Sequence, residues 1–380
     1  MSDLHKPRIA FLIPRLGITD RGAEVFVFEL IKRLRKNFSV TVFTRANTSN
    51  NSSLLSELEL YSEISICHIT SPPTSITLLK LLSRFKKLEV FVTRLHIDPT
   101  ELEMLLFSLF CLPRLFGKFD LLFPVNGIWG AIICRIIRRI NGIPFVYSSQ
   151  GGIEPLIARQ KPNIYFSIHP STAVWLHTYF PKLRVIYIPN GVDLKRFSPK
   201  GKKAHLDLPR PIFITVAALI SSKQVDLTIH AVAQLKRGSL VILGEGILKN
   251  ELLQLALQKL GPHRFKLLSV SNLQVPEYLR AADVFTLAAP WEVGIGLVQS
   301  EAMACGLPIV SNNESTIVQM LGKAGMVCDV RNSSEYSLTL KMVSQKHFGN
   351  APRLQAHRYS WNKIAKKYST HLFRLVSLIN

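Results

Sequence analysis

The 380-residue sequence has few acidic residues and few cysteines. Asp and Glu number 25 against 47 Lys and Arg, so the formal net charge is +22 at pH 7. The five cysteines are scattered, odd in number and without C-x-x-C spacing. They indicate neither a disulfide framework nor a zinc site, and they suit a reducing cytosol. The positive charge favours anionic partners, which include nucleic acid, anionic membrane surfaces and phosphorylated small molecules.

Long apolar runs are also missing. No uncharged stretch reaches the about 20 residues that a membrane-spanning helix needs. The N-terminal segment lacks the three regions of a signal peptide, and its short apolar run predicts a first buried strand instead. The hydrophobic share of 47% is ample for folded cores. Because a single core rarely exceeds about 250–300 residues, we expect two domains.

Residues 78–95 place four basic side chains among leucines at helical intervals. Such a helix either lies on an anionic bilayer with its apolar face immersed, or packs on the protein core with a solvated basic face. Together with the net charge, this segment makes an anionic membrane surface an expected contact. The predicted location is the cytoplasm, with peripheral attachment at the inner face of the plasma membrane.

The rest of the chain alternates between strand and helix patterns, which predicts parallel sheets covered by helices. A polar loop is predicted over residues 46–56, and a linker rich in Pro and Lys ends near Arg210. Two α/β halves joined by a linker imply a cleft between them, where ligands prefer to bind. The predicted strands are 9–13, 40–44, 88–93, 120–124, 144–148, 211–220, 240–243 and 284–289, and the predicted helices are 23–36, 225–235, 247–260 and one from 297 onward.

Residues 279–311 combine a strand, a turn with two glycines and the start of a helix. Glycine turns leave backbone amides free, and a helix N-terminus favours negative charge, so this arrangement suits a phosphate. Carboxylates flank the turn, and beside a phosphate they need neutral donors such as sugar hydroxyls. The stretch therefore predicts a nucleotide-sugar pocket, or else an ordinary strand–turn–helix unit whose glycines only make the turn. The candidate residues are Glu292, Gly294, Gly296, Leu297, Val298 and Glu301.

Two other glycine-containing loops follow predicted strands. The loop after the first strand holds Gly17, Arg21 and Gly22, and Gly244 follows the strand at 240–243. Loops at the carboxyl ends of parallel strands are the usual ligand-binding positions of open α/β sheets. The first loop lacks the G-x-G-x-x-G pattern, so no dinucleotide site is predicted.

Several spaced segments match a known family. They are residues 188–199, 243–246, 278–287, 296–313 and 360–368, with a looser match at 21–34. On these motifs the chain resembles retaining glycosyltransferases of the GT-B fold, in the family 4 group. The resemblance spans nearly the whole chain and implies an α/β fold of two Rossmann-like parallel-sheet domains that face a cleft. It implies an acceptor-side domain over residues 1–200, joined by the C-terminal helix at 361–380, and a donor-binding domain over 201–360.

The resemblance implies that Lys223 contacts the diphosphate of the donor. In the family, an arginine and a lysine five positions apart grip the donor diphosphate; here Lys223 keeps the lysine, whereas Ala218 replaces the arginine. A lysine at that position stabilises the charge that develops on the leaving nucleotide. Arg21 stands where relatives commonly have a second glycine, and we hypothesise that it replaces the missing cation.

Two further departures concern the sugar. Glu301 fits the family's ribose-binding glutamate, but Val293 occupies the position of the first glutamate of the pair. Either a shifted turn brings in Glu292 from one residue earlier, or that sugar contact is lost. Gln150 stands where many relatives have a sugar-contacting histidine, and a glutamine can donate and accept hydrogen bonds but cannot carry a proton.

The implied activity is transfer of a hexose from a nucleotide sugar to a saccharide or lipid-linked acceptor, in envelope or polysaccharide biosynthesis. The resemblance implies retention at the anomeric carbon without a metal, and no Asp-x-Asp motif is present. The expected partners are this donor and acceptor, with no further cofactor. A non-catalytic nucleotide-sugar-binding protein would explain the departures together, and a sugar-nucleotide 2-epimerase shares the architecture. No nucleic-acid-binding module is recognisable, so nucleic acid is not an expected partner.

Overall fold

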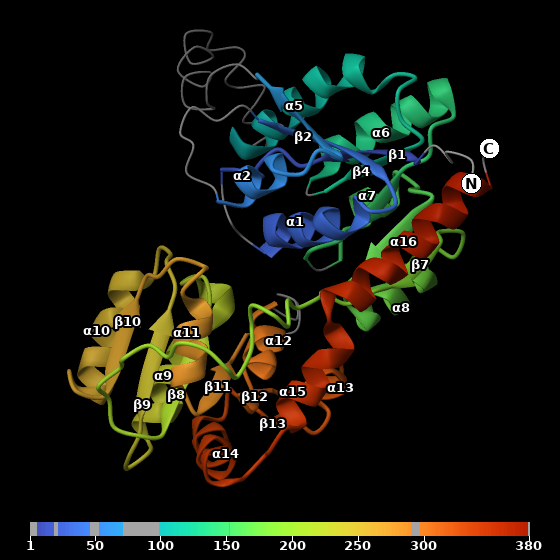
Figure 1. The fold of residues 1–380 in the computed structure, drawn as a ribbon. Coiled ribbons are helices and arrows are strands. Elements are labelled where there is room, and N and C mark those ends of the chain that lie inside the picture. The colour runs from blue at the N-terminus through green and yellow to red at the C-terminus, as the bar shows by residue number, and fades with distance from the viewer. Residues whose placement is uncertain are drawn as a thin grey trace, which may run out of the picture. The chain divides into compact units, whose positions relative to one another are not determined.

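The computed structural model describes residues 6–18, 22–45, 53–70, 99–125, 127–151, 153–289 and 297–378. The chain divides into two compact units (Figure 1). Unit 1 is Met1–Ile188 together with Ala365–Asn380, and unit 2 is Pro189–Ile364.

Unit 1 is built on parallel strands in the order β3-β2-β1-β4, followed by β5-β6-β7. The two sets are joined at one point, because the Leu122 amide donates to the Pro144 carbonyl oxygen at 3.0 Å and Leu122 pairs with Phe145 in a parallel bridge. The strands are β1 (Arg8–Leu12), β2 (Ser39–Arg45), β3 (Ile64–Ile69), β4 (Leu121–Pro124), β5 (Val146–Ser148), β6 (Ile164–Ser167) and β7 (Val185–Tyr187).

Helices of unit 1 bury one face against these strands. In α1, for example, Phe26, Leu30 and Leu34 recur four residues apart and are all buried, which is the spacing of an amphipathic helix. The helices are α1 (Gly22–Leu34), α2 (Ser53–Glu59), α5 (Pro99–Leu115), α6 (Ile128–Asn141), α7 (Pro155–Ala158) and α8 (Pro170–Tyr179).

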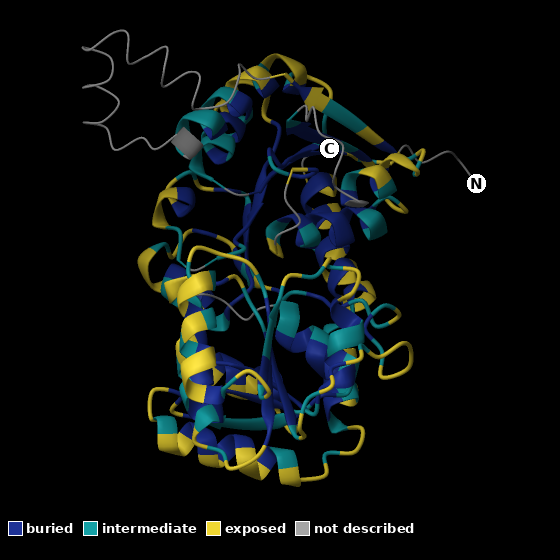
Figure 2. Ribbon diagram, turned by 90° about the vertical axis from the view of Figure 1, so that its left-hand side faces the viewer, coloured by how far each residue is buried: buried dark blue, intermediate teal, exposed yellow. Residues whose placement is uncertain are grey.

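Unit 2 contains a six-stranded parallel sheet in the order β10-β9-β8-β11-β12-β13. Its central strands are predominantly apolar and are buried on both faces, as expected for a sheet covered by helices on each side (Figure 2). The strands are β8 (Ile212–Val216), β9 (Ser239–Leu243), β10 (Phe265–Leu268), β11 (Val284–Leu287), β12 (Ile309–Asn312) and β13 (Gly325–Cys328).

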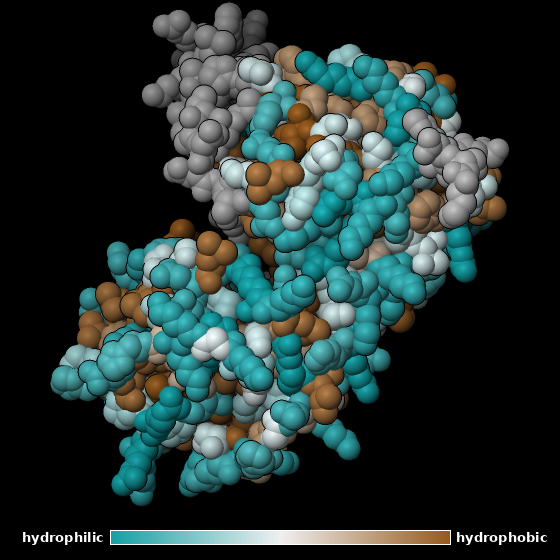
Figure 3. All heavy atoms as spheres, viewed as in Figure 1, coloured by the Kyte–Doolittle hydropathy of each residue, from teal (hydrophilic) through white to brown (hydrophobic). Residues whose placement is uncertain are grey.

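The helices of unit 2 connect these strands and complete two apolar clusters, one on each side of the sheet. On the face shown in Figure 3, polar side chains predominate over unit 2 and the apolar areas are small and separated. The helices are η1 (Ser221–Lys223), α9 (Val225–Ala233), α10 (Lys249–Leu260), α11 (Val275–Ala281), α12 (Leu297–Ala304), α13 (Ser315–Leu321), α14 (Ser333–Gln345), α15 (Ala351–Ala356) and η3 (His357–Tyr359).

The last helix, α16 (Trp361–Ser377), begins in unit 2 and continues in unit 1. Its first turn is tied to the linker, because the Trp361 amide donates to the Val192 carbonyl oxygen at 3.1 Å. Gly191 lies directly against the Trp361 ring: a Cβ at that position would come within 2.4 Å of the ring. The turn formed by Pro189, Asn190 and Gly191 therefore needs glycine for close packing.

These observations confirm the predicted α/β fold of two Rossmann-like parallel-sheet halves. The loop predicted over residues 46–56 is wrong at its end, because α2 begins at Ser53 and buries Leu54 and Leu58, which lie four residues apart. The predicted strand 88–93 and the basic segment 78–95 lie outside the described residues. Among the helices that are described, none has the length and apolar character that crossing a membrane requires.

Candidate functional site

In each unit, one sheet has a point where the strand order reverses. In unit 2, β8 pairs with β9 on one side and with β11 on the other, and the chain reaches β11 only after β10 at the edge. Ligands of open α/β sheets bind outside the carboxyl ends of the strands at such a switch point. The loop that follows β8 and the segment that follows β11 are therefore the first places to look for a site.

Lys223 lies in the loop after β8. It ends the short helix η1, and the next residue, Gln224, takes a left-handed conformation with φ of 47° before α9 begins. Lys223 is half-buried, and burial lowers the pKa of its ammonium group. No carboxylate of the described residues lies within ion-pair distance of it. A partly desolvated cation without an anionic partner is suited to binding an anionic ligand.

The position of the family arginine carries no charge, because Ala218 is exposed and apolar. The β8 loop is instead held by its backbone. The Leu219 amide donates to the Glu245 carbonyl oxygen at 2.8 Å, and the Leu248 amide donates to the Leu219 carbonyl oxygen at 3.0 Å. Two adjacent loops at the carboxyl edge are thus fastened to each other.

Glycine is required where these two loops touch. A Cβ at Gly244 would lie 1.9 Å from the carbonyl oxygen of Ala217, and a Cβ at Gly246 would lie 2.3 Å from that of Leu219. The Gly244 amide donates to the Leu268 carbonyl oxygen at 3.0 Å, so it is already engaged within the protein. The observed role of Gly244 is therefore to let the β8 and β9 loops approach closely.

Helix α12 follows β11 and presents its N-terminus at the same edge. Leu297, Val298 and Glu301 are half-buried, whereas Gln299 is buried and its Oε1 has no hydrogen-bond partner among the described residues. Gln299 was not singled out from the sequence, because a glutamine in an apolar helix gives no signal until its burial is known. Glu292, Gly294 and Gly296 lie outside the described residues.

Arg353 fixes the other end of α12. Its guanidinium donates to the carbonyl oxygens of Ala304 and Phe197 at 2.6 Å and of Leu194 at 2.8 Å. Unpaired carbonyls at a helix C-terminus are thereby satisfied by a cation, which the helix dipole also favours. One side chain holds α12 and the linker together, and so helps fix where the α12 N-terminus lies.

In unit 1 the switch point is between β1 and β4. The loop after β1 contains Gly17, which has φ of +93°. A Cβ added at this position would lie 2.7 Å from a Leu55 side-chain atom. Gly22 is the first residue of α1. Arg21 lies outside the described residues, so its hypothesised role stays a prediction.

Gln150 follows β5, near the carboxyl edge of unit 1. It is half-buried, and its Nε2 donates to the buried Ser148 Oγ at 3.0 Å. Glu154, four residues later, accepts hydrogen bonds from the hydroxyls of Tyr147 at 3.2 Å and Tyr165 at 3.4 Å. Burial raises the pKa of the Glu154 carboxyl. Side-chain hydrogen bonds therefore hold this loop on both sides of Gln150.

The predicted residues thus fall into one group in each unit. Lys223, Leu297, Val298 and Glu301 follow the neighbouring strands β8 and β11 in unit 2. Gly17, Gly22 and Gln150 follow strands of unit 1. Within the described parts of the chain, no three His, Cys, Asp or Glu side chains are grouped so that they could hold a metal ion.

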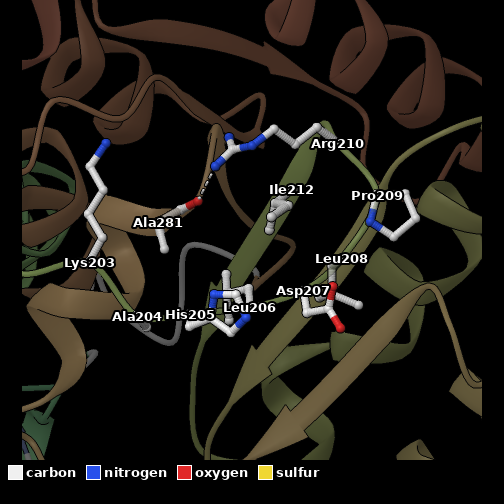
Figure 4. A pocket seen from close by; sticks show the side chains of 10 residues that line it. All are labelled: Lys203, Ala204, His205, Leu206, Asp207, Leu208, Pro209, Arg210, Ile212 and Ala281. Atoms are coloured by element: carbon white, nitrogen blue, oxygen red, sulfur yellow. Dashed lines mark hydrogen bonds between the residues drawn. The ribbon is translucent and has the colours of Figure 1, made fainter.

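A cavity of about 480 Å³ lies beside the linker and belongs to neither group. It is lined by residues 203–210, Ile212 and Ala281, and Arg210 donates to the Ala281 carbonyl oxygen across it at 3.1 Å (Figure 4). Ile212 is the first residue of β8, so this cavity is at the amino-terminal end of the strand, whereas Lys223 follows the carboxyl end. By the rule for parallel sheets, the carboxyl end is the better candidate.

Two Rossmann-like sheets, with a lysine and a helix N-terminus at one switch point, have the architecture of α/β proteins that bind nucleotides. Residues 199–357 match the family model for glycosyl transferases group 1. The crystal structure of Anabaena Alr3699/HepE in complex with UDP has a TM-score of 0.71 with 16% identity, and the match covers 97% of this chain and 100% of that chain. The chain therefore has the GT-B fold, and its residues 199–357 are similar to the group 1 glycosyl transferases.

Two curated glycosyltransferases are also similar to this chain in sequence. Over 227 residues the chain is 28% identical to the UDP-Gal:alpha-D-GlcNAc-diphosphoundecaprenol alpha-1,3-galactosyltransferase of Escherichia coli, which covers 52% of this chain and 58% of the relative. It is also 28% identical over 228 residues to the N-acetylgalactosamine-N,N'-diacetylbacillosaminyl-diphospho-undecaprenol 4-alpha-N-acetylgalactosaminyltransferase of Campylobacter jejuni, covering 58% of this chain and 57% of that relative. The matches span less than two thirds of the length of either relative.

Proposed function

We propose that the protein is a glycosyltransferase that moves a hexose from a nucleotide sugar to a saccharide or lipid-linked acceptor. The observation that carries the proposal is Lys223: a partly buried cation with no carboxylate partner among the described residues, placed at the switch point of the sheet that matches the family. When a nucleotide diphosphate leaves, negative charge grows on its phosphate oxygens. A lysine held there stabilises that charge in the transition state.

The remaining donor contacts follow from the neighbouring elements. We assign the diphosphate to the N-terminus of α12 as well as to Lys223, because unpaired helix amides and the helix dipole both favour phosphate. Glu301 accepts hydrogen bonds from the ribose hydroxyls, and Gln150 contacts the hexose. The anomeric configuration is retained without a metal, with a donor phosphate oxygen taking the proton of the acceptor. The protein then contributes mainly by positioning and by charge.

The proposed acceptor is a saccharide carried on a lipid diphosphate. Both relatives named above carry diphospho-undecaprenol in their names, and a basic protein attracts such an anionic substrate. This acceptor places the reaction at the cytoplasmic face of a membrane, in envelope or polysaccharide biosynthesis.

A surface of unit 1 supports contact with an anionic bilayer. Ile136 and Ile140, one turn apart on α6, are exposed, as are Leu109 and Phe110 on the neighbouring α5. The two helices meet near their N-termini, where Trp129 Nε1 donates to Glu101 Oε2 at 2.8 Å. Arg114, Arg135 and Arg139 lie on the same helices. Exposed apolar side chains next to arginines are the composition of a peripheral membrane surface.

The donor is tested first. Isothermal calorimetry with UDP, GDP and ADP and their sugars, without and then with magnesium, identifies the donor and its metal requirement. The expected result is selective binding without metal and slow release of free nucleotide. Proton NMR of a product formed on a lipid-linked acceptor then reports the anomeric configuration, and an inverted product contradicts retention.

The second candidate is a nucleotide-sugar-binding protein that does not catalyse transfer. It is favoured by the exposed Ala218, which leaves one of the two family cations missing. Binding of a nucleotide sugar without turnover, with lipid-linked acceptors present, selects this candidate. The absence of any nucleotide binding rejects both.

The membrane contact is tested separately by co-sedimentation with phosphatidylglycerol vesicles and with phosphatidylcholine vesicles. The double variant Ile136→Glu/Ile140→Glu is expected to lose binding to the anionic vesicles. Leu273→Glu, which changes another exposed apolar residue, in unit 2, is the matched control. Equal binding of the two variants contradicts the assignment of this surface.

A further inference from the structure

A chain of hydrogen bonds joins α16 to Gln150. Tyr368, on α16, shares a hydrogen bond between its hydroxyl and Ser148 Oγ at 3.0 Å. Ser148 Oγ also accepts from Gln150 Nε2 at 3.0 Å. Tyr368 and Ser148 are fully buried, whereas Gln150 is half-buried. The chain therefore runs from the core of unit 1 to a side chain at its carboxyl edge.

The Tyr368 hydroxyl is held in place by the packing of its ring. The ring centroid lies 4.6 Å from that of Phe166 on β6, 5.8 Å from Phe26 on α1 and 6.5 Å from Phe123 on β4. A ring enclosed by three aromatic neighbours from three elements keeps one orientation. The hydroxyl consequently occupies a defined position. Its hydrogen bond with Ser148 fixes the Ser148 Oγ, and this oxygen in turn orients the Gln150 amide.

The network also determines what Gln150 can offer to a ligand. An amide has one acceptor oxygen and two N–H donors, and a hydrogen bond by one end orients the other. Because Nε2 is engaged by Ser148, Oε1 is turned to the opposite side of the amide. Oε1 accepts no hydrogen bond from the described residues. A sugar hydroxyl is the group that such an oxygen would accept from.

We propose that Tyr368 is a positioning residue: through Ser148 it holds the Gln150 amide so that its carbonyl oxygen accepts a hydrogen bond from a hydroxyl of the transferred sugar. The proposal rests on the proposed function, because it takes Gln150 to contact the donor sugar. It assigns to α16 a part in the site that its sequence motif does not reveal. Tyr368 touches no substrate and acts only through Ser148.

A second buried tyrosine provides the control. Tyr336, on α14 in unit 2, is also fully buried, and its hydroxyl contacts Thr228 Oγ1 at 3.1 Å and Thr286 Oγ1. Neither threonine is hydrogen-bonded to a predicted site residue among the described residues. Tyr336→Phe removes the same atom as Tyr368→Phe from a comparable environment, so any general effect of losing a buried hydroxyl appears in both variants.

The first measurement follows the NMR signals of the Gln150 side-chain amide. Glutamine-selective ¹⁵N labelling of the full chain gives side-chain amide signals, and Gln150→Ala identifies the Gln150 pair by its disappearance. In the wild-type protein these signals are expected away from free-glutamine positions and protected from exchange with water. Tyr368→Phe and Ser148→Ala should move them toward free-glutamine positions, whereas Tyr336→Phe should not. Unchanged Gln150 signals in Tyr368→Phe overturn the proposal.

The second measurement uses the transfer reaction. Tyr368→Phe is expected to lower kcat about tenfold with little change in the donor KM, since the sugar binds but is held in fewer productive poses. In the Gln150→Ala background the same change should have no further effect. An equal loss in both backgrounds overturns the proposal. If the wild-type protein transfers no sugar, the proposed function fails, and the amide signals still decide whether Tyr368 orients Gln150.

Discussion

The two units share a sheet order around the switch point but hold their carboxyl-edge loops in different ways. In unit 2 the loops are held by backbone contacts at glycines, such as Gly244 against Ala217. In unit 1 the loop after β5 is held by side chains, with Ser148 on one side and Glu154 on the other. The same architecture is thus stabilised by backbone hydrogen bonds between closely approaching loops in one half and by side-chain hydrogen bonds in the other.

This difference explains why the two halves differ in how recognisable they are. A Cβ at Gly244 would lie 1.9 Å from a backbone oxygen, which leaves no choice but glycine, so the motif persists in any sequence that keeps the loop. A hydrogen-bonded network can be rebuilt from several combinations of Ser, Tyr, Glu and Gln. The family model accordingly matches residues 199–357 of unit 2.

The largest expected effect is the difference in stability between adding one methyl group to a unit 2 loop and adding one to a unit 1 loop. Gly244→Ala forces a Cβ onto the Ala217 carbonyl and should destabilise unit 2 by about 3 kcal/mol, with loss of donor binding. Gly151→Ala in unit 1 meets nothing within 4 Å and should change stability by less than about 0.5 kcal/mol. Urea unfolding of both variants checks the contrast, and equal effects would remove the distinction between the loops.

The second effect concerns charge at the unit 2 site. Lys223→Met is expected to weaken nucleotide-sugar binding about 10- to 100-fold. This is the loss in affinity expected when a charged hydrogen bond to a phosphate is removed. Lys249→Met is the control, because Lys249 already pairs with Glu245 at 2.7 Å on the surface. Calorimetry on both variants measures the difference. Similar losses in the two would show that general charge, rather than Lys223, attracts the donor.

The pH dependence of Lys223 separates binding from stability. Since burial lowers its folded-state pKa, the unfolded state holds the proton more tightly, and the stability contribution of Lys223 rises as the pH increases from the folded toward the unfolded value. Donor binding needs the charged form and should fall over the same interval. Subtracting the Lys223→Met profiles from the wild-type profiles isolates both trends. Trends of the same sign would contradict the assignment.

The smallest effect tests the polar network of unit 1. The raised pKa of Glu154 means that its contribution to stability is present below the unfolded value of about 4.5 and is lost as the pH rises through the folded value. Glu154→Gln should therefore gain stability relative to wild type as the pH rises. Glu245 in unit 2 has a lowered pKa through its hydrogen bond from Lys249, so Glu245→Gln should show the opposite trend. Denaturation from about pH 3 to 8 compares them, because the change expected for Glu245 falls below the unfolded value of about 4.5.

Much of the fold could be predicted because apolar periodicity is a local signal. The five-residue strand β9 and the helix α1 follow directly from their patterns. The helix at Ser53 could not be predicted, since Leu54 and Leu58 are only recognisable as buried once their neighbours are known. At the site, the sequence pointed to Lys223 but not to its burial, which depends on packing. Tyr368 and Gln299 were missed because their partners lie far away in the chain or do not exist in the described structure.

The division of unit 1 into two stretches of sequence has a consequence for synthesis. The ribosome makes residues 1–188, then all of unit 2, and only afterwards the part of α16 that completes unit 1. Until Tyr368 and Phe373 emerge, Phe26, Phe38 and Phe166 lack aromatic partners that cover them in the finished protein. Unit 2 can close its cores first, although it is translated second. The nascent N-terminal half therefore exposes an apolar face until α16 has been synthesised, and chaperones recognise surfaces of this kind.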